Sequence, residues 1–167
     1  RQMCIRDRRY VATKIMDDFG HGMNFRDHAV LYRMNGSPSV SGKTPFTDVR
    51  TDEWYSAAVL WAYQNGIVTG MSDTTFAPIN NVTREQMATI LFRYTKTAAP
   101  DKAKASADLS GFADAGSVND WAVDAMRWAV GQKLIAGIPL EQSVYLQPRG
   151  NATRAQAATV LTRYYAQ

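Results

Sequence analysis

The sequence predicts an all-α fold built from tandem helix–loop–helix repeats. A set of motifs occurs twice in the same order, and each copy holds two stretches with the apolar spacing of an amphipathic helix. The paired motifs are Phe-x-Asp at 46–48 and 112–114, two tryptophans, a glycine at 70 and 137, and Thr-Arg-x-Gln at 83–86 and 153–156. One unit of roughly 50 residues is barely large enough to bury a core alone, so we expect neighbouring repeats to pack together.

The first helix of each unit is predicted from apolar side chains at i, i+4 and i+7, which share one helix face. These residues are Trp54, Ala58 and Trp61 in the first copy and Trp121, Ala125 and Trp128 in the second. Asp52 or Thr51 can cap the first of these helices, and Asn119 the second. Gly66 lies just after the first of these helices, where a residue in the left-handed conformation often ends a helix. The second copy has Lys133 at this position, so we expect its helix to end differently.

The second helix of each unit is predicted to open with a capping box. The side-chain oxygen of Thr83 or Thr153 accepts from the backbone of Gln86 or Gln156, whose side chain reaches back to the threonine. An apolar stripe follows, made of Met87, Ile90, Leu91 and Tyr94 in one copy and Ala157, Val160, Leu161 and Tyr164 in the other. The loop between the two helices is rich in turn-forming residues, and we expect at most a short extended piece around Phe76.

The repeats predict a division of the chain into four parts. These are a degenerate or truncated first repeat with its linker at 1–44, a repeat at 45–98, a linker at 99–110 and a repeat at 111–167. The segment 31–34 resembles the helix end at 91–94, but the tryptophan helix and the Thr-Arg box that should precede it are missing. The first repeat is therefore expected to be incomplete, which would leave one position of any repeat bundle, the third, incomplete as well.

Composition and charge exclude several classes of function. Residues 37–167 contain twelve basic and eleven acidic side chains, so there is no basic stripe that could bind nucleic acid. No stretch is long and apolar enough to span a membrane. The single Cys4 and the two histidines, His21 and His28, exclude a disulfide framework and a Cys or His metal centre, and no cofactor is expected. The chain starts at Arg1 without a visible secretion signal, so its N-terminus does not indicate a compartment.

Taken together, the motifs resemble the S-layer homology (SLH) domain. The resemblance rests on Phe-x-Asp-Val at 46–49, the tryptophan helix, Gly-Ile-Val-x-Gly at 66–70, Phe-x-Pro at 76–78 and Thr-Arg-Glu-Gln at 83–86. It implies a non-catalytic extracellular anchor at the cell wall or S-layer, with three repeats in a pseudo-threefold bundle. It also implies binding of secondary cell-wall polysaccharide, often carrying a pyruvate ketal, in grooves between adjacent repeats.

Arg84 and Arg154 give this resemblance a physical basis. Each follows an N-cap threonine, where unsatisfied backbone N–H groups and the positive end of the helix dipole favour an anion. A guanidinium there can hold a carboxylate through two hydrogen bonds. The plainer interpretation is that both arginines are solvated residues of a first helical turn.

The candidate ligand-binding residues form two sets. The first combines Thr83 and Arg84 of one repeat with Asp114, Trp121 and Gly137 of the next. The second consists of two half-sites, Asp48, Trp54 and Gly70, and Thr153 and Arg154. Each is expected to bind weakly because the degenerate first repeat cannot supply its partner. The threonines are first of all caps, the aspartates are expected to bond backbone in a turn, and the glycines would allow a ligand close to the backbone. Trp61 and Trp128 are expected in the core, whereas the sequence does not decide between core and ligand contact for Trp54 and Trp121.

An enzyme is not expected, and no catalytic residue is assigned. Asp48 and Asp114 are the clear acidic pair shared by the repeats, and neither intact repeat contains the histidine of a nucleophile–histidine–acid site. The serious alternative to glycan binding is a structural repeat that mediates self-assembly between S-layer protein copies at the cell surface.

Overall fold

A computed structural model describes residues 31–33, 35–104 and 107–166. Cys4, His21, His28 and most of the degenerate first repeat lie outside these residues. The chain divides into two compact units, Arg1–Asn80 and Asn81–Gln167. The boundary falls between the two helices of the first intact repeat, so the second helix of that repeat shares a unit with the whole of the next repeat.

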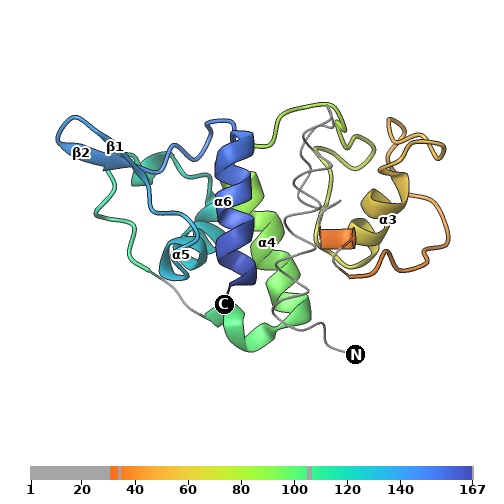
Figure 1. Cartoon of the computed structure of the whole chain (residues 1–167). Helices are drawn as coiled ribbons and strands as arrows, with labels where there is room; N and C mark the ends of the chain where they lie inside the picture. The colour runs from red at the N-terminus through yellow and green to blue at the C-terminus, as the bar shows by residue number, and fades with distance from the viewer. Residues whose placement is uncertain (1–30, 34, 105–106, 167) are drawn as a thin grey trace. The chain divides into compact units, whose positions relative to one another are not determined.

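The first unit is built around helix α3 (Ser56–Gln64) (Figure 1). Its core contains Phe46, Val49, Tyr55 and Val59, with Phe76 packed against them. Burying these apolar and aromatic side chains is the main favourable term in folding, and it joins the Phe-x-Asp segment to the helix and to the loop beyond it.

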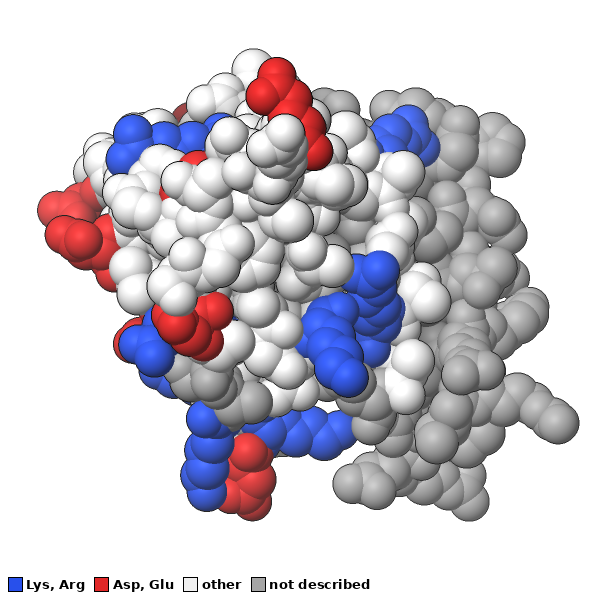
Figure 2. Space-filling model, turned by 90° about the vertical axis from the view of Figure 1, so that its left-hand side faces the viewer, with Lys and Arg blue, Asp and Glu red and all other residues white. Residues whose placement is uncertain are grey.

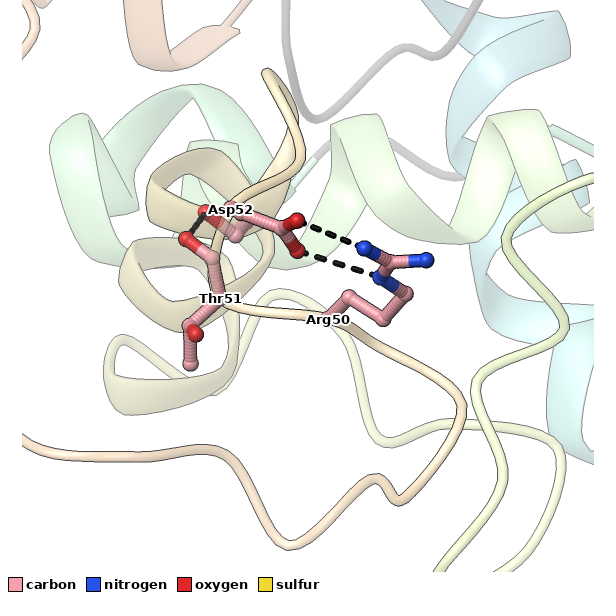
Figure 3. Close-up of polar contacts among 4 residues, drawn as sticks. Arg50, Thr51 and Asp52 are labelled. Atoms are coloured by element: carbon pink, nitrogen blue, oxygen red, sulfur yellow. Dashed lines mark hydrogen bonds and ion pairs between the residues drawn. The ribbon is translucent and has the colours of Figure 1, made fainter.

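Helix α3 begins later than predicted, and neither Asp52 nor Thr51 caps it through a side chain. Asp52 instead pairs with Arg50, with 2.6 Å between Nη2 and Oδ2 and 3.1 Å between Nε and Oδ1 (Figure 3). The hydroxyl of Ser56 donates to the carbonyl oxygen of Thr51 over 3.1 Å. Since the helix starts at Ser56, Trp54 precedes it and is 47% exposed.

The second unit contains most of the described secondary structure (Figure 1). Its elements are α4 (Arg84–Ala98), η1 (Pro100–Lys104), η2 (Ala115–Ser117), η3 (Asp120–Ala122), α5 (Val123–Gly131), β1 (Ile138–Leu140), β2 (Ser143–Tyr145) and α6 (Arg154–Tyr165). Trp128 on α5 is 2% exposed and packs its ring 5.4 Å from that of Phe92 on α4. Its indole N–H donates to the carbonyl oxygen of Lys102 over 2.9 Å, so Trp128 is a core residue, as predicted.

The predicted all-α pseudo-threefold bundle, with its incomplete third position, is wrong. Strands β1 and β2 pair antiparallel, with Ile138 opposite Tyr145 and Leu140 opposite Ser143. The outer side of β2 is also bonded, because the backbone N–H of Ala113 donates to the carbonyl oxygen of Val144 over 3.0 Å. Strands of three residues are too short to show a period of two in the sequence, so only this backbone pairing reveals them.

The local signals for the second helices are confirmed. Thr83 and Thr153 each cap their helix and form complete capping boxes with Gln86 and Gln156. The predicted stripes face the core, where Met87, Leu91, Ala157, Val160 and Leu161 are all buried. These interactions join residues three or four positions apart, which is why periodicity alone reveals them.

The prediction that the first helices of the two repeats end differently is wrong. Lys133 adopts a left-handed conformation at φ +58°, close to φ +66° at Gly66. The following bonds also match: the N–H of Ile67 donates to Ala62 over 2.8 Å, and that of Leu134 to Ala129 over 2.8 Å. The closing turn is thus the same in both copies, although a lysine pays a steric cost there that glycine avoids.

Within the described residues, every helix is too short or too polar to cross a lipid bilayer.

Candidate functional site

Asp114 closes the loop that carries the hairpin of the second unit. Its Oδ1 accepts from the backbone N–H of Leu146 and its Oδ2 from that of Gln147, each over 2.7 Å. Asp48 binds Phe76 and Ala77 in the same way in the first unit, over 2.9 and 2.7 Å. Both aspartates therefore bond to backbone N–H groups, as expected from the sequence. Their partners lie in a loop 28 to 33 residues further along the chain and not in a nearby turn.

The N-terminus of α4 is docked on this loop. The backbone N–H of Arg84 donates to Gly150 and that of Glu85 to Pro148, each over 3.0 Å, and Gln86 donates to the Thr83 side chain. The N–H groups that a helix start normally leaves unsatisfied are thus already bonded. The expectation that they await an anion is wrong for α4, because the next repeat supplies the acceptors.

The guanidinium of Arg84 retains its capacity to bind an anion. The residue is only 5% exposed, and its Nε donates to the carbonyl oxygen of Leu146 over 2.7 Å. Burial lowers the pKa of Arg84, and the negative charge of Asp114 opposes that shift. Within the described part of the chain, Arg84 forms no ion pair and its two Nη atoms have no hydrogen-bond partner, yet neither atom is fully enclosed. Since an arginine side chain has five N–H donors, four remain for a ligand.

The rim of the site is formed by residues that the sequence did not identify as binding residues. Glu85 is 3% exposed and accepts from the backbone N–H of Asn119 over 3.1 Å and from its side-chain amide over 2.5 Å. Arg149 in turn donates to Oδ1 of Asn119 over 3.2 Å. Asn119 therefore binds Glu85 and Arg149 instead of capping the following helix through its side chain. The available signal was the difference between the boxes, where the second copy has Ala155 in place of Glu85.

Trp121 lies two residues after Asn119 on η3 and is 51% exposed. Such a ring offers an apolar face on the surface, which suits the C–H face of a sugar. The structure therefore brings Arg84 and Asp114 together and connects them, through Glu85 and Asn119, to the segment that carries Trp121.

The two candidate glycines are needed by the packing of their own loops. Gly137 has φ +79°, and a Cβ there would lie 2.5 Å from Val144 and 2.7 Å from Phe112. Gly70 has φ +80°, and a Cβ there would lie 2.8 Å from two backbone carbonyl oxygens. Both conformations favour glycine and the close contacts leave no space for a side chain, whether or not a ligand is bound.

The remaining candidates are distributed over both units. Asp48, Trp54 and Gly70 belong to the first unit, whereas Thr153 and Arg154 are exposed at the start of α6 in the second. On the face shown in Figure 2, basic and acidic side chains are interspersed among uncharged residues. The described residues contain no group of three or more His, Cys, Asp or Glu side chains that could hold a metal ion.

Comparison with known proteins identifies the same two segments. Residues 45–88 and 111–158, more than half of the chain, match the S-layer homology domain. The chain is 35% identical to a surface-layer 125 kDa protein of Lysinibacillus sphaericus over 73% of this chain and 10% of that protein. It is 33% identical to an amylopullulanase of Thermoanaerobacterium thermosulfurigenes over 80% of this chain and 7% of the enzyme. It is 32% identical to an endoglucanase of a Bacillus strain, KSM-635, over 80% of this chain and 14% of the enzyme.

Proposed function

The chain belongs to the S-layer homology domain family, and we propose that it is a non-catalytic module that anchors a longer protein to the cell wall by binding an anionic secondary cell-wall polysaccharide. The acidic group that we propose is the carboxylate of a pyruvate ketal. The module would act outside the cell, at the wall or S-layer.

The relatives support anchoring over catalysis. One is named as a surface-layer protein, one as an amylopullulanase and one as an endoglucanase, yet the chain spans only 7% to 14% of their lengths. A segment shared by proteins of such different activity suits a common attachment role. The chemistry of the attached protein is a separate matter, since function resides in sites and not in a shared fold.

One observation carries the proposal of an anionic ligand: the buried guanidinium of Arg84 has no ion-pair partner among the described residues. Removing a cation from water is costly unless an anion or several acceptors compensate. Leu146 supplies one acceptor, and both oxygens of Asp114 already bind backbone N–H groups. A ligand carboxylate with two oxygens would match the two Nη groups that remain.

The proposed binding residues comprise one main set, all in the second unit, and two weaker half-sites, one in each unit. The main set is Thr83, Arg84, Asp114, Trp121 and Gly137, with Thr83, Asp114 and Gly137 shaping the site and Arg84 and Trp121 contacting the glycan. The weaker half-sites are Asp48, Trp54 and Gly70 in the first unit and Thr153 and Arg154 in the second, each without its partner repeat. The repeats at 45–98 and 111–167, with the linker at 99–110 and the degenerate or truncated first repeat with its linker at 1–44, remain the proposed domain division.

Arg84→Lys provides the test, because it keeps the charge but removes the planar pair of donors. We expect binding to purified wall polysaccharide, measured by calorimetry, to weaken at least tenfold. Lys104→Gln, an exposed change in the same unit, should bind like the wild type. The urea midpoint of each variant verifies folding, since Arg84 also bonds to Leu146.

Equal binding by Arg84→Lys and the wild type would contradict the proposed site. Retention of the wild type on walls stripped of polysaccharide would instead favour self-assembly between protein copies, the alternative function.

A further inference from the structure

Arg149 is held against the same helix turn that carries Arg84. The carbonyl groups on either side of it, those of Pro148 and Gly150, accept the backbone N–H groups of Glu85 and Arg84. The turn itself is closed by a bond from the N–H of Gly150 to the carbonyl oxygen of Gln147 over 3.0 Å. Proline at the second position of this turn restricts φ in advance. The backbone of Arg149 is thus fixed beside the start of α4.

The side chain of Arg149 is oriented by a relay from Glu85. The Glu85 carboxylate can only accept hydrogen bonds, so the amide nitrogen of Asn119 must face it, over 2.5 Å. The amide oxygen of Asn119 then faces the opposite way, where Nη2 of Arg149 donates to it over 3.2 Å. Glu85 and Asn119 are therefore positioning residues for the Arg149 guanidinium.

The positive charge of Arg149 is not neutralised by a neighbouring carboxylate. The residue is exposed and, within the described residues, forms no ion pair. Neither carboxylate of the site is bonded to Arg149, because both oxygens of Glu85 accept from Asn119 and both oxygens of Asp114 accept from loop N–H groups. Two guanidinium groups with available N–H donors thus flank the start of α4, one buried and one at the rim.

The first repeat lacks this arrangement. The residue that follows the corresponding Pro78 is Ile79, which is 78% exposed and carries no charge. In the second copy of the box, Ala155 takes the place of Glu85. The second cation and its positioning carboxylate therefore occur together at one site, the one assembled around Arg84.

We infer that Arg149 is a second ligand-binding cation, and that this site selects glycans with two carboxylates over glycans with one. Arg84 and Arg149 are held by different acceptors, the carbonyl oxygen of Leu146 and the side-chain oxygen of Asn119, which suits two acidic groups along one polysaccharide strand. The inference rests on the proposed function, since it assigns the preferred ligand of that same site.

The test compares two probes by calorimetry on the full chain: a methyl glycoside with one pyruvate ketal, and a disaccharide with a pyruvate ketal on each sugar. We expect the wild type to bind the disaccharide at least tenfold more tightly. Arg149→Gln should weaken disaccharide binding about tenfold, the scale of one charge-assisted hydrogen bond, and change monosaccharide binding less than twofold. Arg149→Lys should retain most of the preference, and the preference should shrink with added salt.

The outcomes separate this inference from the proposed function. If the wild type binds neither probe nor the purified polysaccharide, the proposed function itself fails. If the wild type binds both probes and Arg149→Gln keeps the same ratio of affinities, the second cation is refuted while the Arg84 site stands. A loss that is equal for both probes would place both arginines on one carboxylate and overturn the selectivity. Lys104→Gln is the matched control, since it removes one exposed positive charge from the same unit.

Discussion

Replacing Asp114 with alanine should unfold the loop that supports the binding site. The change removes two charge-assisted hydrogen bonds of 2.7 Å, to the backbone N–H groups of Leu146 and Gln147. Each such bond contributes about 1.5–3 kcal/mol, and Leu146 is 0% exposed, so water cannot easily replace the lost acceptor. Because Asp114 is itself only half-buried, we expect the lower end of the summed range, about 3 kcal/mol of lost unfolding free energy.

Two measurements check this value. Urea unfolding followed by tryptophan fluorescence reports the free energy, since Trp128 is buried in the same unit. Amide hydrogen exchange reports the site directly, and the N–H groups of Leu146 and Gln147 should lose protection in Asp114→Ala. Asp114→Asn should cost less, about 2 kcal/mol, because its amide keeps one acceptor oxygen but turns a donor toward the second N–H group.

Asp48→Ala is the matched control in the first unit, where the carboxylate binds Phe76 and Ala77. It should leave exchange at Leu146 and Gln147 unchanged. A loss below about 1 kcal/mol in Asp114→Ala, with protection at both amides intact, would refute the view that this carboxylate closes the loop.

Two further predictions concern stability. Lys133→Gly should raise the unfolding free energy by about 1 kcal/mol, because Lys133 has φ +58° and glycine relieves the steric cost of that conformation. A lower urea midpoint in this variant would contradict the prediction, and Gly66→Lys should lower the unfolding free energy. Burial raises the pKa of Tyr164 to about 12, with the Thr95 hydroxyl opposing the shift. Since an unfolded tyrosine ionises near pH 10, the stabilisation from Tyr164 should be complete below that pH and lost between about pH 10 and 12. Urea midpoints across this window should fall less steeply in Tyr164→Phe; equal slopes in the two proteins would show that Tyr164 ionises normally.

The starts of α4 and α6 were predictable because their interactions are local. Thr83 and Gln86, or Thr153 and Gln156, meet within one turn, so a short motif specifies both bonds. The end of helix α5 at Lys133 was not predictable from local sequence. Its residue type disfavours the left-handed conformation, but the surrounding chain imposes it, and the packing of Leu134 and Ile135, both buried, compensates.

The roles at the candidate site were only partly predictable. Arg84 was identified from its place after the N-cap, but the reason given for it was wrong, because the backbone N–H groups beside it are already bonded. Arg149 belonged to no motif, Glu85 stood in the Thr-Arg-Glu-Gln motif without an assigned role, and Asn119 resembled a cap. Their roles follow from contacts across 30 or more residues, which no local pattern contains.

The amino-acid sequence by itself determined the repeats, the capping boxes, the apolar stripes and the family, because each depends on residue types at short, regular spacing. Only the tertiary structure decided the hairpin, the closure of the loop by Asp114 and the burial of Arg84 against Leu146, 62 residues away. Those features depend on which carbonyl or carboxylate oxygen accepts a hydrogen bond from which distant N–H group. That pairing is set when the repeats pack together.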